Sequence, residues 1–187
     1  MPDSQKTSHK AIVAAAVELI ERDGSEALSM RAVARRLGIA PNALYNYFLD
    51  RKTLEATVAA EGTRRLRAAL RRAAKGAVEA EVVCRSCRAY LRFARRRPAL
   101  YAMMMKKHPD IPGLRAARAG LQDFFRGLFG SLADPQPAQT AGFMAWALLH
   151  GTVVQENDGL LDHAGLPADS FSATWAQIAA LSRALTG

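Results

Sequence analysis

The chain has 187 residues, of which 50% are hydrophobic and 23% are charged, and its formal net charge is +9. This composition is typical of a globular protein of one domain or two joined domains, and it excludes a disordered or fibrous chain. The chain has only two cysteines, so a secreted disulfide scaffold is also excluded. The longest apolar run, Ala141–Val154, contains His150 and is too short to span a bilayer, so we expect a cytoplasmic protein without a membrane segment.

The positive charge is distributed unevenly along the chain. Residues 1–126 carry a formal net charge of +13, whereas residues 127–187 carry −4. A basic surface on the first part attracts polyanions, which are either nucleic acid or an anionic membrane. Charge alone does not distinguish between these two partners.

Helical periodicity dominates the chain and predicts an all-α fold, because apolar residues recur at three- and four-residue spacing and strand-like alternation is nearly absent. Ser8 and Ser29 are good N-caps, and Gly24 and Gly38 are good C-terminal stops. Asp50 is placed to cap a long helix. In chain order, we predict helices over residues 9–23, 30–37, 41–47, 50–74, 79–97, 99–107, 113–132, 136–158 and 168–186.

The segment Met30–Phe48 is the most informative part of the sequence. Two helices that cross steeply through a short turn need a small residue where they approach, a glycine in the turn and apolar contacts on both inner faces. Ala34 and Gly38 meet the first two requirements. The third is met by five apolar residues spaced to face inward: Val33, Leu37, Ile39, Leu44 and Tyr47. The pattern predicts a helix-turn-helix, and the alternative is a three-helix corner with a merely polar surface.

A helix-turn-helix places its second helix in the DNA major groove, where base edges distinguish all four base pairs. On that helix, Asn42 and Asn46 carry amides that can hydrogen-bond to base edges. Tyr45 offers a hydroxyl to phosphate and a ring to a thymine methyl, Ala43 can pack on a methyl, and Tyr47 is shared between the core and a phosphate contact. The residues expected to hold phosphates are Ser29, Arg31, Arg51 and Lys52.

Together these residues resemble the N-terminal part of the TetR family of transcriptional regulators. The resemblance covers residues 9–58 and rests on Gly24, Leu28–Arg31, Val33–Ala34, Leu37–Ile39, Leu44–Tyr45, Tyr47–Phe48 and Leu54. It implies an all-helical homodimer with a DNA-binding domain over residues 8–54 and an effector-binding and dimerisation domain over residues 55–187. It also implies that the last two helices pair with their symmetry mates. The family usually has Lys at the position of Arg51, so the charge is kept while the geometry of the phosphate contact differs.

The second part of the chain resembles the Trp-His-Gly type of C-terminal domain in this family, through Tyr90, Phe93, Pro98–Tyr101 and Trp146–Gly151. Aromatic and Met side chains suit a pocket for a small, largely apolar effector, although most such residues in a helical domain are plain packing. For His150, which shares a helix face with Trp146, we favour a buried histidine over a hydrogen-bonding wall of the pocket. The predicted pocket residues are Tyr90, Phe93, Tyr101, Met104, Phe124, Trp146 and His150.

Two further features admit other functions. Cys84 and Cys87 form a CxxC motif that could serve thiol chemistry or supply half of a zinc site. The sequence has no second cysteine pair. We therefore interpret both cysteines as small side chains packed in the core. Residues 64–75 are rich in arginine, and their apolar face is too narrow for membrane insertion. We therefore interpret the basic face as a solvated surface that strengthens the positive potential near DNA. A thiol oxidoreductase and a basic membrane-surface protein are the alternatives, and neither explains Met30–Phe48.

The sequence therefore predicts a homodimeric, ligand-responsive transcriptional regulator without enzymatic activity, metal or cofactor. Its expected partners are a near-palindromic double-stranded DNA operator and a small-molecule effector. The long helix that starts near Asp50 belongs to both predicted domains and is the expected lever between them. Repression with release by the effector is the expected mode, although the sequence does not distinguish it from activation, and it does not disclose the effector or the operator.

Overall fold

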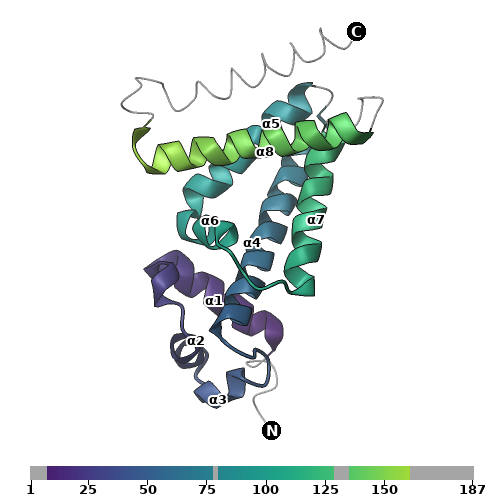
Figure 1. Cartoon of the computed structure of the whole chain (residues 1–187). Coiled ribbons are helices and arrows are strands. Elements are labelled where there is room, and N and C mark those ends of the chain that lie inside the picture. Colours follow the sequence, from purple (N-terminus) through teal and green to yellow (C-terminus); the bar gives the residue numbers. More distant parts are fainter. Residues whose placement is uncertain (1–7, 78–79, 129–134, 161–187) are drawn as a thin grey trace. The chain divides into compact units, whose positions relative to one another are not determined.

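The computed structural model describes residues 8–77, 80–128 and 135–160, and the regular elements in these segments are all helices (Figure 1). The all-α prediction is therefore confirmed. The elements are α1 (His9–Asp23), the 3-10 helix η1 (Ser25–Ala27), α2 (Met30–Leu37), α3 (Pro41–Leu44), α4 (Arg51–Ala74), α5 (Ala80–Arg96), α6 (Pro98–Met105), α7 (Pro112–Gly127) and α8 (Pro135–Asn157). The helix predicted over residues 168–186 lies outside the described segments.

Both α1 and α2 begin and end where the sequence predicts, because local capping groups fix their ends. The Ser8 hydroxyl accepts a hydrogen bond from the Ala11 N–H at 3.1 Å, and the Ser29 hydroxyl accepts one from the Ala32 N–H at 3.1 Å. Gly24 ends α1 with a φ of 86°, which residues with a side chain rarely adopt. Caps of this kind are local, and they are therefore readable from sequence.

Three other helices are shorter than predicted. The helix α3 ends at Leu44 rather than residue 47, α6 ends at Met105 rather than residue 107, and α7 ends at Gly127 rather than residue 132. Extended backbone at Lys106, with ψ of 156°, ends α6. The Leu128 N–H bonds back to the carbonyl oxygens of both preceding phenylalanines, which closes α7 as a turn. The short η1 was not predicted, because three residues carry no periodic pattern.

The chain divides into two compact units. Unit 1 consists of residues 1–65 and 97–119, and unit 2 consists of residues 66–96 and 120–187. The helices α4 and α7 each contribute their first part to unit 1 and their last part to unit 2. The two units are defined by packing contacts within the chain. The predicted boundary at residue 54 separates DNA binding from effector binding, and it stays a prediction.

Unit 1 is built around the apolar face of α1. Ile12, Ala16 and Ile20 recur every four residues on this face, and all three are fully buried. The helix packs against α2, η1 and α6. Leu28, which follows η1, and Leu54 of α4 are also fully buried, so they extend the same core.

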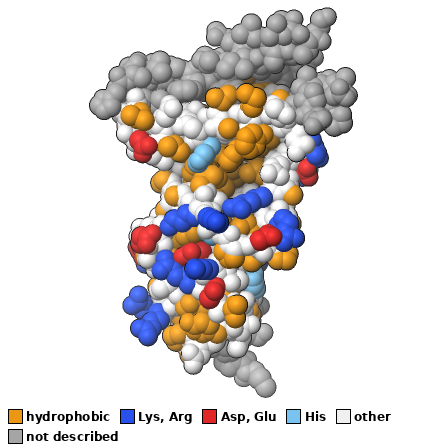
Figure 2. Space-filling view, in the orientation of Figure 1, with side chains coloured by type: hydrophobic (Ala, Val, Ile, Leu, Met, Phe, Trp, Pro, Cys, Tyr) orange, Lys and Arg blue, Asp and Glu red, His pale blue; other side chains and the backbone are white. Residues whose placement is uncertain are grey.

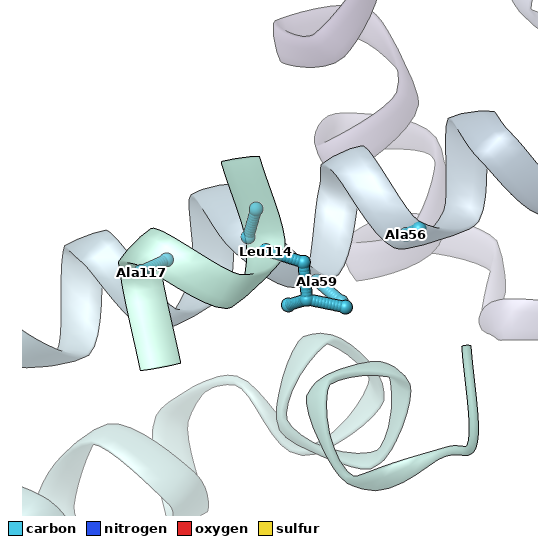
Figure 3. Close-up of a cluster of buried hydrophobic side chains, with 5 residues drawn as sticks. Ala56, Ala59, Leu114 and Ala117 are labelled. Atoms are coloured by element: carbon cyan, nitrogen blue, oxygen red, sulfur yellow. The ribbon is translucent and has the colours of Figure 1, made fainter. Parts of the chain in front are cut away.

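Small side chains line the contact between α4 and the start of α7 in unit 1 (Figure 3). Ala56, Ala59 and Ala60 of α4 cluster with Leu114 and Ala117 of α7, and all five are almost fully buried. The distance between two packed helices depends on the side chains at the contact, so alanines allow a close approach. The alanine-rich first half of α4 is therefore a packing surface.

Gly62 allows a similar close approach of α6 to α4. A Cβ at this position would lie 2.8 Å from both Cγ and Sδ of Met104 and 3.1 Å from Cδ1 of Leu100. Both neighbours are buried, so they have little room to move. Met104 therefore packs directly on α4 within unit 1.

Unit 2 is organised by the contact between α5 and α8. Tyr90 of α5 is fully buried, and its ring meets the ring of Phe125 of α7 edge-on, with centroids 6.1 Å apart. Gly142 brings α8 close to α7, because a Cβ there would lie 3.0 Å from the backbone nitrogen of Arg126. The three helices α5, α7 and α8 thus pack against one another, with aromatic contacts between α5 and α7.

Candidate nucleic-acid interface

The turn between α2 and α3 has the geometry that a helix-turn-helix requires. Gly38 adopts left-handed backbone, with φ of 69° and ψ of 32°, and its N–H donates to the Arg35 carbonyl at 3.2 Å. The Ile39 N–H donates to the Ala34 carbonyl at 3.1 Å, which closes the end of α2. Ala34 is fully buried. A small residue at the approach and a left-handed glycine in the turn are therefore both present.

Packing behind the turn differs among the five residues that are predicted to face inward. Val33 and Leu44 are fully buried, and Leu37 and Ile39 are half-buried. Tyr47 is 40% exposed and is therefore the least buried of the five residues, and its predicted division between the core and a phosphate contact stays a prediction.

The reason lies in the early end of α3. The Phe48 N–H donates to the Leu44 carbonyl at 3.0 Å, and this turn carries the Phe48 side chain into the core, where it is 2% exposed. The His9 ring stacks on Phe48 with centroids 4.8 Å apart. Sequence reasoning missed Phe48 as the buried aromatic, although its four-residue spacing from Leu44 is the signal that identifies it.

The residues predicted to contact bases lie at the surface. Asn42 and Asn46 are exposed, and their side-chain amides make no hydrogen bond with any described residue. Tyr45 is 55% exposed, and Ala43 is half-buried. Figure 2 shows hydrophobic side chains together with Lys and Arg side chains on the surface around α2 and α3. Two amides and an aromatic hydroxyl are therefore available to a ligand on this face.

The residues predicted to hold phosphates lie on the neighbouring helix starts, and they differ in the hydrogen bonds and ion pairs that they already form. The Ser29 hydroxyl oxygen already caps α2, and its proton is still available to donate. Arg31 and Lys52 are exposed, and neither forms an ion pair in the described part of the chain. Arg51 donates from Nε to the Glu55 carboxylate at 2.7 Å, which leaves its two terminal nitrogens available.

Asp50 fixes the start of α4 next to these cations. Its carboxylate accepts a hydrogen bond from the Thr53 N–H at 2.7 Å and from the Thr53 hydroxyl at 2.9 Å. These two hydrogen bonds hold the pKa of Asp50 below its ordinary value. The capped end positions Arg51 and Lys52 on the first turn of α4.

Ion pairs within unit 1 join the helices behind this surface. Arg36 of α2 pairs with Glu18 of α1, and Arg97, which precedes α6, pairs with Glu21 of α1. All four side chains are at least partly exposed, so each pair contributes about 0–1 kcal/mol. They connect α2 and the start of α6 to α1.

Two family patterns match this sequence. The pattern described as "Bacterial regulatory proteins, tetR family" matches residues 12–54, and the pattern described as "Tetracyclin repressor-like, C-terminal domain" matches residues 83–178, slightly more than half of the chain. The chain belongs to the TetR family. It is therefore a DNA-binding transcriptional regulator and not an enzyme.

Similarity of this TetR-family chain to other proteins extends over most of its length. An uncharacterized HTH-type transcriptional regulator of Mycobacterium tuberculosis is 28% identical over 160 residues, which cover 84% of this chain and 73% of that protein. The structure of a Rhodococcus sp. RHA1 protein of unknown function has a TM-score of 0.78 and 26% identity, covering 95% of this chain and 94% of that one. A TetR variant from Acinetobacter baumannii AYE in complex with minocycline has a TM-score of 0.67 and 17% identity, covering 96% and 98%.

The predicted effector residues of this TetR-family chain are divided between the two units. Tyr101 and Met104 lie in unit 1, where each is 3% exposed. The other five lie in unit 2, where Tyr90 and Phe93 are buried and the remaining three are half-buried: Phe124, Trp146 and His150.

Trp146 and His150 form a stacked pair on α8. Their ring planes differ by 4°, and the centroids are 5.6 Å apart. Partial burial lowers the pKa of His150, so the imidazole is neutral at pH 7. The pair therefore consists of two parallel, half-buried rings.

The CxxC does not have the properties of a reactive thiol pair. Cys87 is buried, and burial raises the pKa of its thiol to about 12, so the thiolate is scarce at neutral pH. Among the described residues, no group of three or more His, Cys, Asp or Glu side chains is placed to hold a metal ion. In the same part of the chain, no helix combines the length and hydropathy needed to cross a membrane.

Proposed function

We propose that this chain is a homodimeric repressor that binds a near-palindromic operator and releases it when a small effector binds. The observation that carries the proposal is the α2–α3 pair, in which a left-handed glycine presents Asn42, Tyr45 and Asn46 outward with unbonded side chains. Amides of this kind pair with base edges in the major groove. Cations on the flanking helix starts supply the phosphate contacts that position the reading helix.

A homodimer through α8 and the segment 168–186 is supported by an apolar surface on α8. Phe143, Met144, Leu148 and Val154 are between 41% and 62% exposed. Figure 2 shows hydrophobic side chains gathered over α8. Exposed apolar patches of this kind mark protein interfaces, and a two-fold axis would give the operator its symmetry.

An effector pocket in the second part of the chain is supported by the aromatic core and by the family. A structure of the same fold holds minocycline. We propose Tyr90, Phe93, Phe124, Trp146 and His150, all of unit 2, as lining residues. Tyr101 and Met104 are buried in unit 1, and their role toward an effector stays a prediction. The segment with Trp146, His150 and Gly151 is the basis for proposing the Trp-His-Gly type of C-terminal domain. We also propose a cytoplasmic location, because the protein acts on DNA.

Control would operate as a population shift. An effector weakens DNA binding if it prefers a conformation in which the α3 helices of the dimer do not fit successive major grooves. The coupling free energy is typically about 1–3 kcal/mol, and DNA weakens effector binding by the same amount. The helix α4 supports this mechanism, because it starts beside the candidate DNA surface and its residues contribute to both units. The predicted functional division at residue 54 would fall near its start.

Variants of the surface residues test the DNA-binding roles. Asn42→Ala and Asn46→Ala remove base contacts, so we expect them to change sequence preference by about 1–3 kcal/mol at the affected position. Lys52→Ala removes a phosphate contact, so binding to all duplexes should weaken and the salt dependence should become shallower. Lys107→Ala is the matched control, since Lys107 is an exposed cation of unit 1 that follows α6 and belongs to none of α2, α3 and α4.

The measurement is competition of specific and scrambled duplexes for each variant at several salt concentrations. The roles assigned here are wrong if the asparagine variants and Lys52→Ala behave alike. They are also wrong if Lys107→Ala weakens binding as much as Lys52→Ala does.

A further inference from the structure

Arg67 is a half-buried arginine on the last part of α4, within unit 2, and it forms no hydrogen bond or ion pair with any residue that the structure describes. Three acids of the same unit, Glu81, Asp123 and Glu156, are each paired with another arginine. Charged side chains are rarely withdrawn from water without a partner, because their lost hydration is not replaced. A guanidinium in this state can bind an anion without breaking an existing pair.

Gly120 of α7 provides the space for this guanidinium. A Cβ at Gly120 would lie 1.9 Å from Nη1 of Arg67 and 3.0 Å from Cζ, so the arginine head occupies the place of the missing side chain. The φ of Gly120 is not positive, so the backbone conformation does not require glycine here. Glycine inside a helix is about 1 kcal/mol less favourable than alanine. The space that it leaves for the Arg67 guanidinium accounts for the presence of glycine at position 120.

Aromatic side chains continue from this point along α7. Phe124 lies one turn after Gly120 on the same helix face and is half-buried. Its ring meets Phe125 edge-on, with centroids 6.0 Å apart, and Phe125 meets Tyr90 in the same way at 6.1 Å. Arg67, which has no partner among the described residues, therefore lies at one end of a run of aromatic rings.

We propose that Arg67 binds the anionic head group, a carboxylate or a phosphate ester, of an amphipathic effector whose apolar body contacts Phe124 and the rings behind it. The inference rests on the proposed function, because it names the chemical class of the effector. A guanidinium offers a planar fork of donors that matches two oxygens of such a head group. The aromatic surface supplies the apolar contact that a free inorganic anion lacks.

Calorimetric titration of the full-length protein with decanoate, decyl phosphate and decanol tests this assignment. We expect wild-type protein to bind at least one of the two anions more tightly than the neutral alcohol. Arg67→Gln should weaken binding of that anion about 10- to 100-fold, since charge-assisted hydrogen bonds are lost, and should leave binding of decanol unchanged. Comparison of the two anions shows which head group is preferred.

Gly120→Ala provides a second perturbation that leaves the arginine in place. The added methyl displaces the guanidinium, and only the far end of a flexible side chain has to move, so folding should be unaffected or slightly favoured. Anion binding should nevertheless weaken. The matched controls are Arg71→Gln, an exposed arginine one turn further along α4, and Gly127→Ala, where a Cβ meets nothing within 4 Å.

The inference is wrong if neither anion binds more tightly than decanol, or if Arg71→Gln loses as much anion affinity as Arg67→Gln. It is also wrong if Gly120→Ala binds the anions like wild type. Operator binding is measured on the same preparations to separate this inference from the proposed function. Sequence-specific DNA binding without anion binding refutes only the effector class, whereas absence of sequence-specific DNA binding refutes the proposed function itself.

Discussion

Replacing Gly38 by asparagine, alanine and valine separates the backbone requirement of the turn from its packing. A Cβ at this position meets nothing within 4 Å, so the added Cβ does not clash with a neighbour. The cost arises from the left-handed conformation alone, with φ of 69° and ψ of 32°. For an L-residue this conformation costs roughly 1–2 kcal/mol, less for asparagine and more for a β-branched residue.

We therefore expect local stability to fall in the order glycine, asparagine, alanine, valine. A loss of about 1 kcal/mol in Gly38→Ala corresponds to roughly fivefold faster amide exchange wherever opening of the turn limits exchange. Hydrogen-exchange mass spectrometry of peptides within residues 30–48 measures this effect, because the Ile39 N–H is bonded to the Ala34 carbonyl. Gly127→Ala is the control, since Gly127 lies in a helix without positive φ and also has open space around it.

Sequence preference for DNA should be the same in wild type and Gly38→Ala, because the reading side chains are unchanged once the turn is formed. Equal exchange rates in wild type and the three Gly38 variants would contradict the left-handed turn. A valine variant that exchanges more slowly than the alanine variant would contradict it as well. Either result would remove the local geometry on which the assignment of Asn42 and Asn46 depends.

Two further predictions concern single side chains. Ser86→Ala should raise the free energy of unfolding by about 1 kcal/mol in a thermal melt, because the buried Ser86 hydroxyl has no hydrogen-bond partner among the described residues; a loss of stability would contradict this. The lowered pKa of Asp50 predicts a stabilising contribution that is complete above the ordinary aspartate pKa and is lost as pH falls through the lowered value. Acid unfolding of Asp50→Asn should lack this component, and identical acid profiles would refute it.

Much of unit 1 was predictable from local signals. Ser8 and Ser29 cap α1 and α2 through side-chain hydrogen bonds over three residues, and Gly24 and Gly38 end these helices through their own backbone conformation. The apolar face of α1 follows from its four-residue spacing. Such features depend on a few neighbouring residues, so the sequence contains them directly.

Other features depend on contacts between distant residues and were not predicted. Phe48 is the deeply buried aromatic residue after α3 because α3 ends early, which single-residue propensities do not indicate. The place of the Arg67 guanidinium is set by Gly120, on another helix, and no periodic pattern connects the two positions. The predicted effector residues remain predictions for the same reason, since a pocket is formed by several helices together.

Selection of bound sequences from random duplex DNA by the purified full-length protein tests the central claim most directly. The account predicts enrichment of a near-palindromic sequence with two half-sites one helical turn, or a multiple of it, apart. It also predicts that Asn42→Ala enriches a different base at one symmetric pair of positions. No enrichment over the starting pool at moderate salt would contradict the claim that α3 reads DNA.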